Sequence, residues 1–278
     1  MKKLALLFLA GLMSSALTAQ ELPKPSPLGK TEQKVGLTDV SVEYSRPSVK
    51  GRTIFGDLVP YNTLWRLGAN ACTKFTTSTD MKVAGKALPA GTYALFATPM
   101  EDGTWQIDFN SNTKQSGTGD YDAKLNVVSV KVKATDNSFN ETFTIGFNNV
   151  TANSAHLSIE WEKLRVDVPF TVNTAKNAEM NIEAAIKEGT DLDKVYYSAA
   201  SYYMSAVEDL KKATMYIDKS LAVKEAHNSL FLKARILHAD GQKDKAIETA
   251  SKALEMAKAA DSKGWASYIE GTIADWKK

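Results

Sequence analysis

The hydrophobic pattern of this chain changes abruptly near residue 174, and no other feature constrains the fold as strongly. All eight prolines of the 278-residue chain lie before that point. Before it, apolar and polar residues alternate in short runs separated by turn-forming residues, which is typical of antiparallel strands. After it, Ala, Lys and Glu dominate and apolar residues recur every three or four positions, which predicts helices. We therefore expect an α+β protein with separate domains, all-β over residues 25–172 and all-α over residues 173–278.

The many short strands of the first part favour an antiparallel β-sandwich or a flattened barrel. The expected strands cover residues 40–44, 73–79, 81–84, 86–88, 92–98, 105–109, 125–134, 141–147, 155–161 and 164–172. Between the first two, Gly and Pro interrupt the chain too often for one long element. We expect a short helix within residues 56–67, because three apolar residues there would share one helical face. Trp105, Phe109 and Trp161 alternate with polar neighbours and are expected in the core.

The loop over residues 44–70 concentrates arginine and aromatic residues. Guanidinium groups bind carboxylate or phosphate through paired hydrogen bonds and stack on aromatic rings, so the loop predicts an anion or sugar site. The candidate ligand-binding residues, one of them on a later strand, are Arg46, Arg52, Tyr61, Trp65, Arg66, Asn70 and Tyr93. The length of the loop favours a structural role instead, because so long a loop needs fastening. In that case the arginines fasten the loop by bonding backbone carbonyls, or they pair with acids such as Asp57 or Asp108.

Two runs in this part resemble a known family. They are YSRPSVKGR-IFG-LVPY--LWR-GAN, over residues 44–70, and VAGKALPAGTYALFATP, over residues 83–99. Both resemble the DUF2911 family of Bacteroidota secreted proteins, and the resemblance extends from about Pro25 to Phe170. The name of that family records that its function is unknown. The resemblance therefore implies a domain boundary and a lineage, and it implies no catalytic residues.

Residues 1–19 have the composition of a signal peptide. Lys2 and Lys3 precede the apolar run Leu4–Met13, and small residues up to Ala19 would permit cleavage. The run is too short to span a bilayer, and no cysteine follows it to carry a lipid. We therefore expect a periplasmic or secreted protein without a membrane span.

The charge balance argues against nucleic acid as a partner. Removing the signal peptide takes two of the 34 basic residues and none of the 32 acidic ones, so the formal net charge becomes zero. A neutral chain does not have the basic surface that nucleic-acid binding requires. The same chain has ample length for two hydrophobic cores.

The residues that usually carry chemistry show no recognisable spacing. Cys72 is the only cysteine and would need a nearby base to act as a nucleophile, so we expect an inert thiol. The three histidines, at positions 156, 227 and 238, show no metal-ligand spacing. Neither a phosphate-binding glycine loop nor a dinucleotide fingerprint occurs. The sequence thus predicts no catalytic residue, no metal and no cofactor.

The helical part contains two units of 34 residues, over 193–226 and 227–260. The second unit resembles a tetratricopeptide repeat, and its matching residues are Leu230, Ala234, Leu237, Ala246, Ala250 and Ala253. The first unit matches less fully, and its turn at Ser205–Val207 has no glycine. We expect a leading helix before the units and a closing helix over residues 263–277, because a terminal repeat otherwise exposes an apolar face. About six helices result.

The first helices of these units suggest a place for a partner. The residues expected to face the inner groove are Tyr197, Met204, Phe231, Arg235 and His238. They would bind a peptide or a partner protein, or they would pack a helical appendage against the β domain. We expect a non-catalytic binding or interaction protein, with the β domain as ligand site or platform. The alternatives are an envelope hydrolase or carbohydrate-active enzyme whose carboxylates assemble in space, and a pure spacer.

Overall fold

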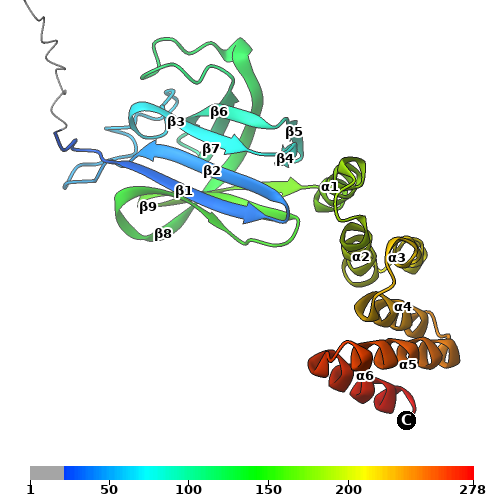
Figure 1. Cartoon of the computed structure of the whole chain (residues 1–278). Helices are drawn as coiled ribbons and strands as arrows, with labels where there is room; N and C mark the ends of the chain where they lie inside the picture. Colours follow the sequence, from blue (N-terminus) through cyan, green and yellow to red (C-terminus); the bar gives the residue numbers. More distant parts are fainter. Residues whose placement is uncertain (1–21) are drawn as a thin grey trace, which may run out of the picture.

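The computed structural model describes residues 22–278, so the predicted signal peptide lies outside the described residues. Nine strands precede six helices (Figure 1). The strands are β1 Leu28–Val35, β2 Thr38–Ser45, β3 Ala69–Thr77, β4 Met81–Val83, β5 Lys86–Leu88, β6 Gly91–Pro99, β7 Thr104–Asn110, β8 Asn126–Asn148 and β9 Ser154–Val172. A short 3-10 turn, Ala123–Leu125, precedes β8. The structure thus confirms a β-rich first part followed by helices.

The nine strands form one open sheet in the order β1-β2-β3-β6-β7-β8-β9-β4-β5. All neighbouring strands are antiparallel, as the alternating pattern predicts. Most connections are short turns between sequence neighbours, which is why the register follows the alternation of apolar residues. The long exceptions are the loop over residues 46–68, which follows β2, and the segment over residues 111–125 between β7 and β8.

The structure has two long strands where the sequence predicts four short ones. β8 pairs with β7 through its first residues and with β9 from Ala134 onward, and its register shifts between Asp136 and Thr144. β9 bends at Glu162, whose φ is 54°. Such irregularities bend a strand and increase its twist, so the sheet folds over its own core. A polar run in the middle of β8 interrupts the alternation of apolar and polar residues. The sequence therefore predicts two strands where the structure has one.

Side-chain and backbone bonds tie the end of β2 to the second half of β8. The buried Tyr44 hydroxyl donates to the carbonyl of Ile145 at 3.1 Å and accepts from its N–H at 2.8 Å. The Val49 N–H donates to the Glu141 carbonyl at 2.8 Å. These contacts cover one side of an aromatic core in which Trp105, Phe109 and Trp161 are buried, as expected.

Two expectations for the β part are wrong. β1 was missed, because its residues are mostly polar and partly exposed, and it forms by pairing with β2 along its whole length. The short helix expected within residues 56–67 does not form. Trp65 exchanges two backbone hydrogen bonds of 2.8 Å with Ala97 of β6, and this pairing requires an extended chain. Leu58 and Tyr61 are exposed instead of sharing a buried face with Trp65.

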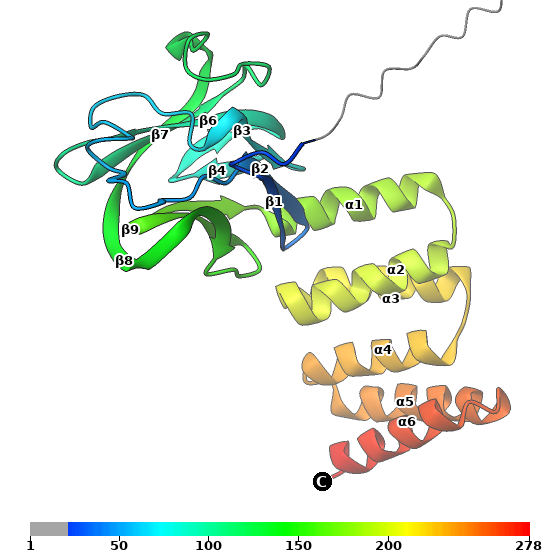
Figure 2. The ribbon, with the colours of Figure 1, turned by 90° about the vertical axis from the view of Figure 1, so that its left-hand side faces the viewer.

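The six helices stack in sequence order away from the sheet (Figure 2). They are α1 Thr174–Glu188, α2 Leu192–Tyr202, α3 Leu210–Val223, α4 His227–Ala239, α5 Lys243–Ala259 and α6 Lys263–Trp276. α2–α3 and α4–α5 match the two 34-residue units to within one residue, and a π-helical turn, Tyr203–Val207, replaces the predicted turn in the first. None of the helices in the described part combines the length and apolar character needed to cross a bilayer.

The helices join the sheet at the start of α1, which follows β9 after one residue. The Thr174 hydroxyl donates to the Ala152 carbonyl at 2.5 Å. The Asn177 amide lies 3.3 Å from the Thr38 hydroxyl and 3.2 Å from the Thr79 hydroxyl. Two turns of the β part and the first residue of β2 therefore hold the first turns of α1.

Candidate functional site

A cavity of about 300 Å³ lies beside the long loop. Its walls come from the chain before β1, the loop itself and β9. The lining residues are Pro25, Ser26, Pro47, Ser48, Lys50, Arg52, Leu58, Val59, Trp65, Arg66, Gly68, Ala69 and Trp161. The loop cavity, as we call it, thus brings together three of the predicted site residues, Arg52, Trp65 and Arg66.

The charged residues of the loop cavity are all basic. Lys50, Arg52 and Arg66 line it, and the described lining includes no Asp or Glu. The Arg52 guanidinium donates to the carbonyls of Val49 at 3.0 Å and Ser48 at 2.6 Å. Arg66 is half-buried, and within residues 22–278 its guanidinium makes neither a hydrogen bond nor an ion pair. The ammonium of the exposed Lys50 is likewise unpaired among the described residues, so Lys50 and Arg66 are the two cations available to a ligand.

Arg46 does not line the cavity. Its guanidinium donates to the Phe143 carbonyl at 3.2 Å and to the Thr144 hydroxyl at 2.9 Å. These bonds, and those of Arg52, are the carbonyl contacts that the structural alternative expects. The predicted pairing with acids is wrong for Asp108, because this fully buried carboxylate accepts hydrogen bonds from Gln106 and Tyr121 instead.

Two tryptophans form the aromatic wall of the loop cavity. Trp65 is half-buried, stacks on Trp161 with ring centroids 5.8 Å apart, and donates its indole N–H to the Gly68 carbonyl at 3.2 Å. Trp161 is 2% exposed. Its indole nitrogen is buried and has no hydrogen-bond partner among the described residues. Nearly all buried polar atoms are paired, so this N–H requires an explanation.

The other predicted site residues lie outside the cavity lining. Tyr93 sits four residues before Ala97 on β6, roughly 13 Å along the strand from the place where Trp65 pairs. Its hydroxyl donates to the Pro89 carbonyl at 2.8 Å. Tyr61 is exposed on the loop. Asn70 supports a wall, because its amide donates to the carbonyl of Ser26 at 3.1 Å.

Sequence reasoning missed two contributors to the loop cavity. Lys50 lies in the predicted loop, but it is not among the residues that the sequence proposes for ligand binding. Trp161 comes from β9, far along the chain, and its alternation with polar residues indicated a core position only. The structure confirms that Trp161 is a core residue. It also lines the loop cavity, because the cavity lies against the edge of the aromatic core.

Cys72 is separate from the loop cavity. The thiol is 5% exposed, packs with Ala94 and Phe96, and lies 3.3 Å from the Thr113 carbonyl. Burial raises the pKa of this thiol, and the nearby Lys74 charge opposes that shift only in part. The thiolate is therefore disfavoured, which agrees with the expected inert thiol.

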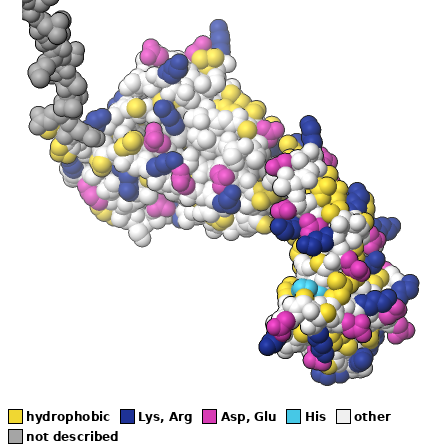
Figure 3. All heavy atoms as spheres, viewed as in Figure 1, with side chains coloured by type: hydrophobic (Ala, Val, Ile, Leu, Met, Phe, Trp, Pro, Cys, Tyr) yellow, Lys and Arg dark blue, Asp and Glu magenta, His cyan; other side chains and the backbone are white. Residues whose placement is uncertain are grey.

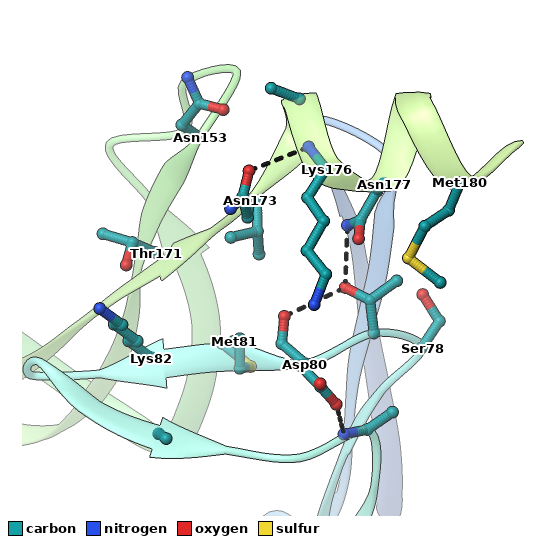
Figure 4. Close-up of a pocket in the computed structure, with 15 residues that line it drawn as sticks. Ser78, Asp80, Met81, Lys82, Asn153, Thr171, Asn173, Lys176, Asn177 and Met180 are labelled. Atoms are coloured by element: carbon teal, nitrogen blue, oxygen red, sulfur yellow. Dashed lines mark hydrogen bonds between the residues drawn. The ribbon is translucent and has the colours of Figure 1, made fainter. Parts of the chain in front are cut away.

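A second, larger cavity of about 740 Å³ lies where α1 meets the β4–β5 hairpin (Figure 4). Lys176 extends from α1 toward the turn that carries Asp80. The Asp80 carboxylate accepts the Ala90 N–H at 2.9 Å, and the Asn173 side chain caps α1 by accepting the Lys176 N–H at 3.0 Å. The charged residues here are of both signs, whereas those of the loop cavity are all basic.

The predicted partner groove is partly filled by the helix that closes the stack. Phe231 is 1% exposed and packs against Trp265, Tyr268 and Trp276 of α6, and His238 stacks on Trp276 with ring centroids 4.4 Å apart. Phe231 is therefore a core residue, and its assignment to the groove is wrong. The periodicity of α4 marks apolar positions, but it does not show which helix covers them.

The predicted groove residues other than Phe231 remain at least partly accessible. Arg235 of α4 is exposed, and the Tyr268 side chain of α6 is 55% exposed. Tyr197 of α2 and Met204 of the π-helical turn that follows it are half-buried against the neighbouring helical core. Burial raises the pKa of the Tyr197 hydroxyl, and the charge of Arg235 opposes this rise. On the face seen in Figure 3, acidic and basic side chains alternate over the helical part.

Comparison with known proteins gives one match. The family model described as "Protein of unknown function (DUF2911)" matches residues 26–170, more than half of the 278-residue chain. Searches of curated proteins and of solved structures found no significant match. All but one of the residues that line the loop cavity fall within the matched range. The chain belongs to the DUF2911 family.

Proposed function

We propose that this protein is an exported, non-catalytic binding protein whose loop cavity takes a small anionic ligand. The supporting observation is the all-basic lining formed by Lys50, Arg52 and Arg66. Like charges gathered in one cavity repel one another, and an anion placed among them relieves this repulsion. A guanidinium offers two parallel N–H donors to a carboxylate or phosphate, which adds geometry to the charge.

The enzyme alternative has less support at this cavity. A glycosidase mechanism needs two carboxyl groups facing the substrate. The described lining of the loop cavity holds none. Arg52 and Arg66 are instead suited to hold a ligand, since a guanidinium offers a planar set of N–H donors that matches a carboxylate or phosphate.

Thermal unfolding of the protein without its signal peptide tests the proposal, with sulfate, phosphate, uronic acids and neutral sugars as probes. A ligand that binds only the folded protein at 100 times its Kd raises the free energy of unfolding by about 2.7 kcal/mol. We expect such a shift with an anionic probe, and we expect Arg66→Ala to abolish it. Arg235→Ala removes the same charge from the helical part and should keep the shift. If no probe stabilises the protein, or if Arg66→Ala keeps the full shift, the anion site is wrong.

We further propose that the helices form tetratricopeptide-like pairs that dock a partner. Two observations support this reading. Each 34-residue unit contains one helix pair, and small residues at the helix contacts, including Ala200, Ala213, Ala234 and Ala250, are fully buried. Export and a Bacteroidota lineage belong to the same proposal and rest on residues 1–19 and on the family resemblance.

Arg235→Glu tests the docking face. Arg235 is exposed and lies near Tyr197. Reversing its charge should remove a charged contact with the partner, which is worth about 1.4 kcal/mol or more. We therefore expect affinity capture to recover at least about tenfold less partner. The same capture with Arg66→Ala should recover the partner normally. Equal recovery with Arg235→Glu and the unmodified protein would exclude this face.

A further inference from the structure

The Arg66 guanidinium also lies against the segment over residues 111–125, which connects β7 to β8. A Cβ built on Gly117 would lie 3.4 Å from Arg66 Nη1, which is van der Waals contact. Gly117 belongs to the tip of this segment, residues 116–120, and the tip does not line the loop cavity, whereas Arg66 does. The unpaired guanidinium is therefore placed between the cavity and the tip.

Few bonds hold the tip in place. The Ser116 hydroxyl donates to the Asn70 carbonyl at 3.3 Å, and Ser116 forms an isolated bridge with Ala71. The Tyr121 N–H donates to the Thr118 carbonyl, also at 3.3 Å, and both hydrogen bonds are long. The backbone N–H groups of the last three tip residues donate no hydrogen bond to any described residue. Exposed backbone with few contacts opens most easily, so we expect the tip to open without the rest of the fold.

The residues on either side of the tip are firmly anchored. Gln115 is 4% exposed, and its amide donates to the Asn112 carbonyl at 2.7 Å. The Tyr121 hydroxyl donates to the Asp108 carboxylate at 3.1 Å, and its ring contacts Phe96 with centroids 4.9 Å apart. A weakly bonded tip between two anchors moves over a short range and returns to the same place, as a cover does.

We infer that the tip is a cover for the anion site, and that an anion bound to Arg66 holds it closed. An oxyanion on this guanidinium lies beside Gly117, where no side chain excludes it. The tip offers backbone N–H donors that have no partner in the described protein, and such donors bond a charged oxygen more strongly than a neutral one. This inference rests on the proposed function and adds the regulation of the same site, since the tip must open to admit the anion and to release it.

Amide hydrogen exchange of the protein without its signal peptide tests the cover. The probes are sulfate, phosphate and glucuronate, with glucose as the neutral control, and labelling times are below one second because unbonded N–H groups exchange fast. We expect the anions that stabilise the protein to slow exchange over residues 116–120 at least about tenfold near saturation, because opening must then release the anion. Exchange at the turn around Gly241, in the helical part, should not change.

Two variants of Gly117 test whether the guanidinium acts on the tip. Gly117→Asp places a carboxylate beside Arg66 and imitates a bound anion. Gly117 has φ of 70°, which both Asp and Asn tolerate, so Gly117→Asn is the neutral control of the same size. We expect Gly117→Asp to bind the anions at least about tenfold more weakly than Gly117→Asn does, and to slow exchange of its tip without any anion.

The outcomes separate the cover from the anion site. An anion that raises the unfolding temperature but leaves exchange of the tip unchanged would overturn the cover and leave the anion site intact. Equal anion binding by the two Gly117 variants would do the same, as would glucose that slows exchange as much as the anions. If no anion stabilises the unmodified protein, both ideas are wrong. Exchange in the unmodified protein decides the inference even if neither variant folds.

Discussion

Phe231→Ala is expected to destabilise the helical part by about 3–5 kcal/mol, the usual cost of removing a fully buried aromatic ring. The Phe231 ring is 1% exposed and contacts three aromatic side chains of α6. Truncation leaves a cavity between α4 and α6, and the closing helix loses its principal contact with α4. Stacked helices depend on their neighbours, so α6 should detach first.

Urea unfolding followed by far-ultraviolet circular dichroism measures this effect, and tryptophan fluorescence reports α6 through Trp265 and Trp276. Arg235→Ala is the matched control on the same helix. It removes an exposed side chain and should change the free energy of unfolding by about 0.5 kcal/mol or less. A loss below about 1 kcal/mol for Phe231→Ala would show that the ring is not part of a packed core, and the groove assignment would return.

The contrast between Phe231 and Arg235 shows what periodicity can and cannot predict. Both residues lie on α4 at positions that face the interior of a repeat stack, and the sequence assigned both to a groove. Spacing fixes which side of a helix a residue occupies, because the helix geometry is regular. Which other helix covers that side depends on how the helices stack. In this protein α6 covers Phe231, and Arg235 stays exposed.

The β part shows the same division between local and long-range information. Strands with clear alternation, such as β2, β6 and β7, lie where they were predicted. β1 has almost no apolar residues, so only its pairing with β2 identifies it. β8 and β9 each continue through a bend instead of ending there. The bend in β8 comes from shifts in its register with β9, and a short polar run is the only trace of it in the sequence.

The loop cavity was partly predictable for the same reason. Arg52, Trp65 and Arg66 are close in sequence, and one loop brings them together. Arg46 lies in the same loop, but its side chain turns toward β8 and binds the backbone there. Trp161 enters from another strand and could not be assigned to a site without the fold. The sequence thus identified the loop, but which of its side chains line the cavity depends on how the loop packs on the sheet.

Gly36→Ala is expected to loosen the junction between the sheet and α1. Gly36 forms the β1–β2 turn with φ of 57°, a conformation that is unfavourable for a residue with a Cβ. A Cβ built there would come within 3.0 Å of both the Thr174 hydroxyl and the Ala152 carbonyl oxygen, closer than real Cβ contacts allow. The Thr174 hydroxyl donates a hydrogen bond to the Ala152 carbonyl oxygen, and this bond holds the start of α1. The added methyl must therefore displace the turn or break this bond.

Gly85→Ala provides a matched control, because Gly85 also has a positive φ, 84°, and nothing lies within 4 Å of its built Cβ. That variant carries only the backbone cost, about 1 kcal/mol, whereas Gly36→Ala adds overpacking of about 1–3 kcal/mol. Urea unfolding of both variants measures the difference, and amide hydrogen exchange along α1 shows where it acts. Faster exchange near Asn177 in Gly36→Ala alone would confirm that the β1–β2 turn anchors the helices. If the two variants lose equal stability and exchange alike, the turn does not hold α1, and the helical part moves independently of the sheet.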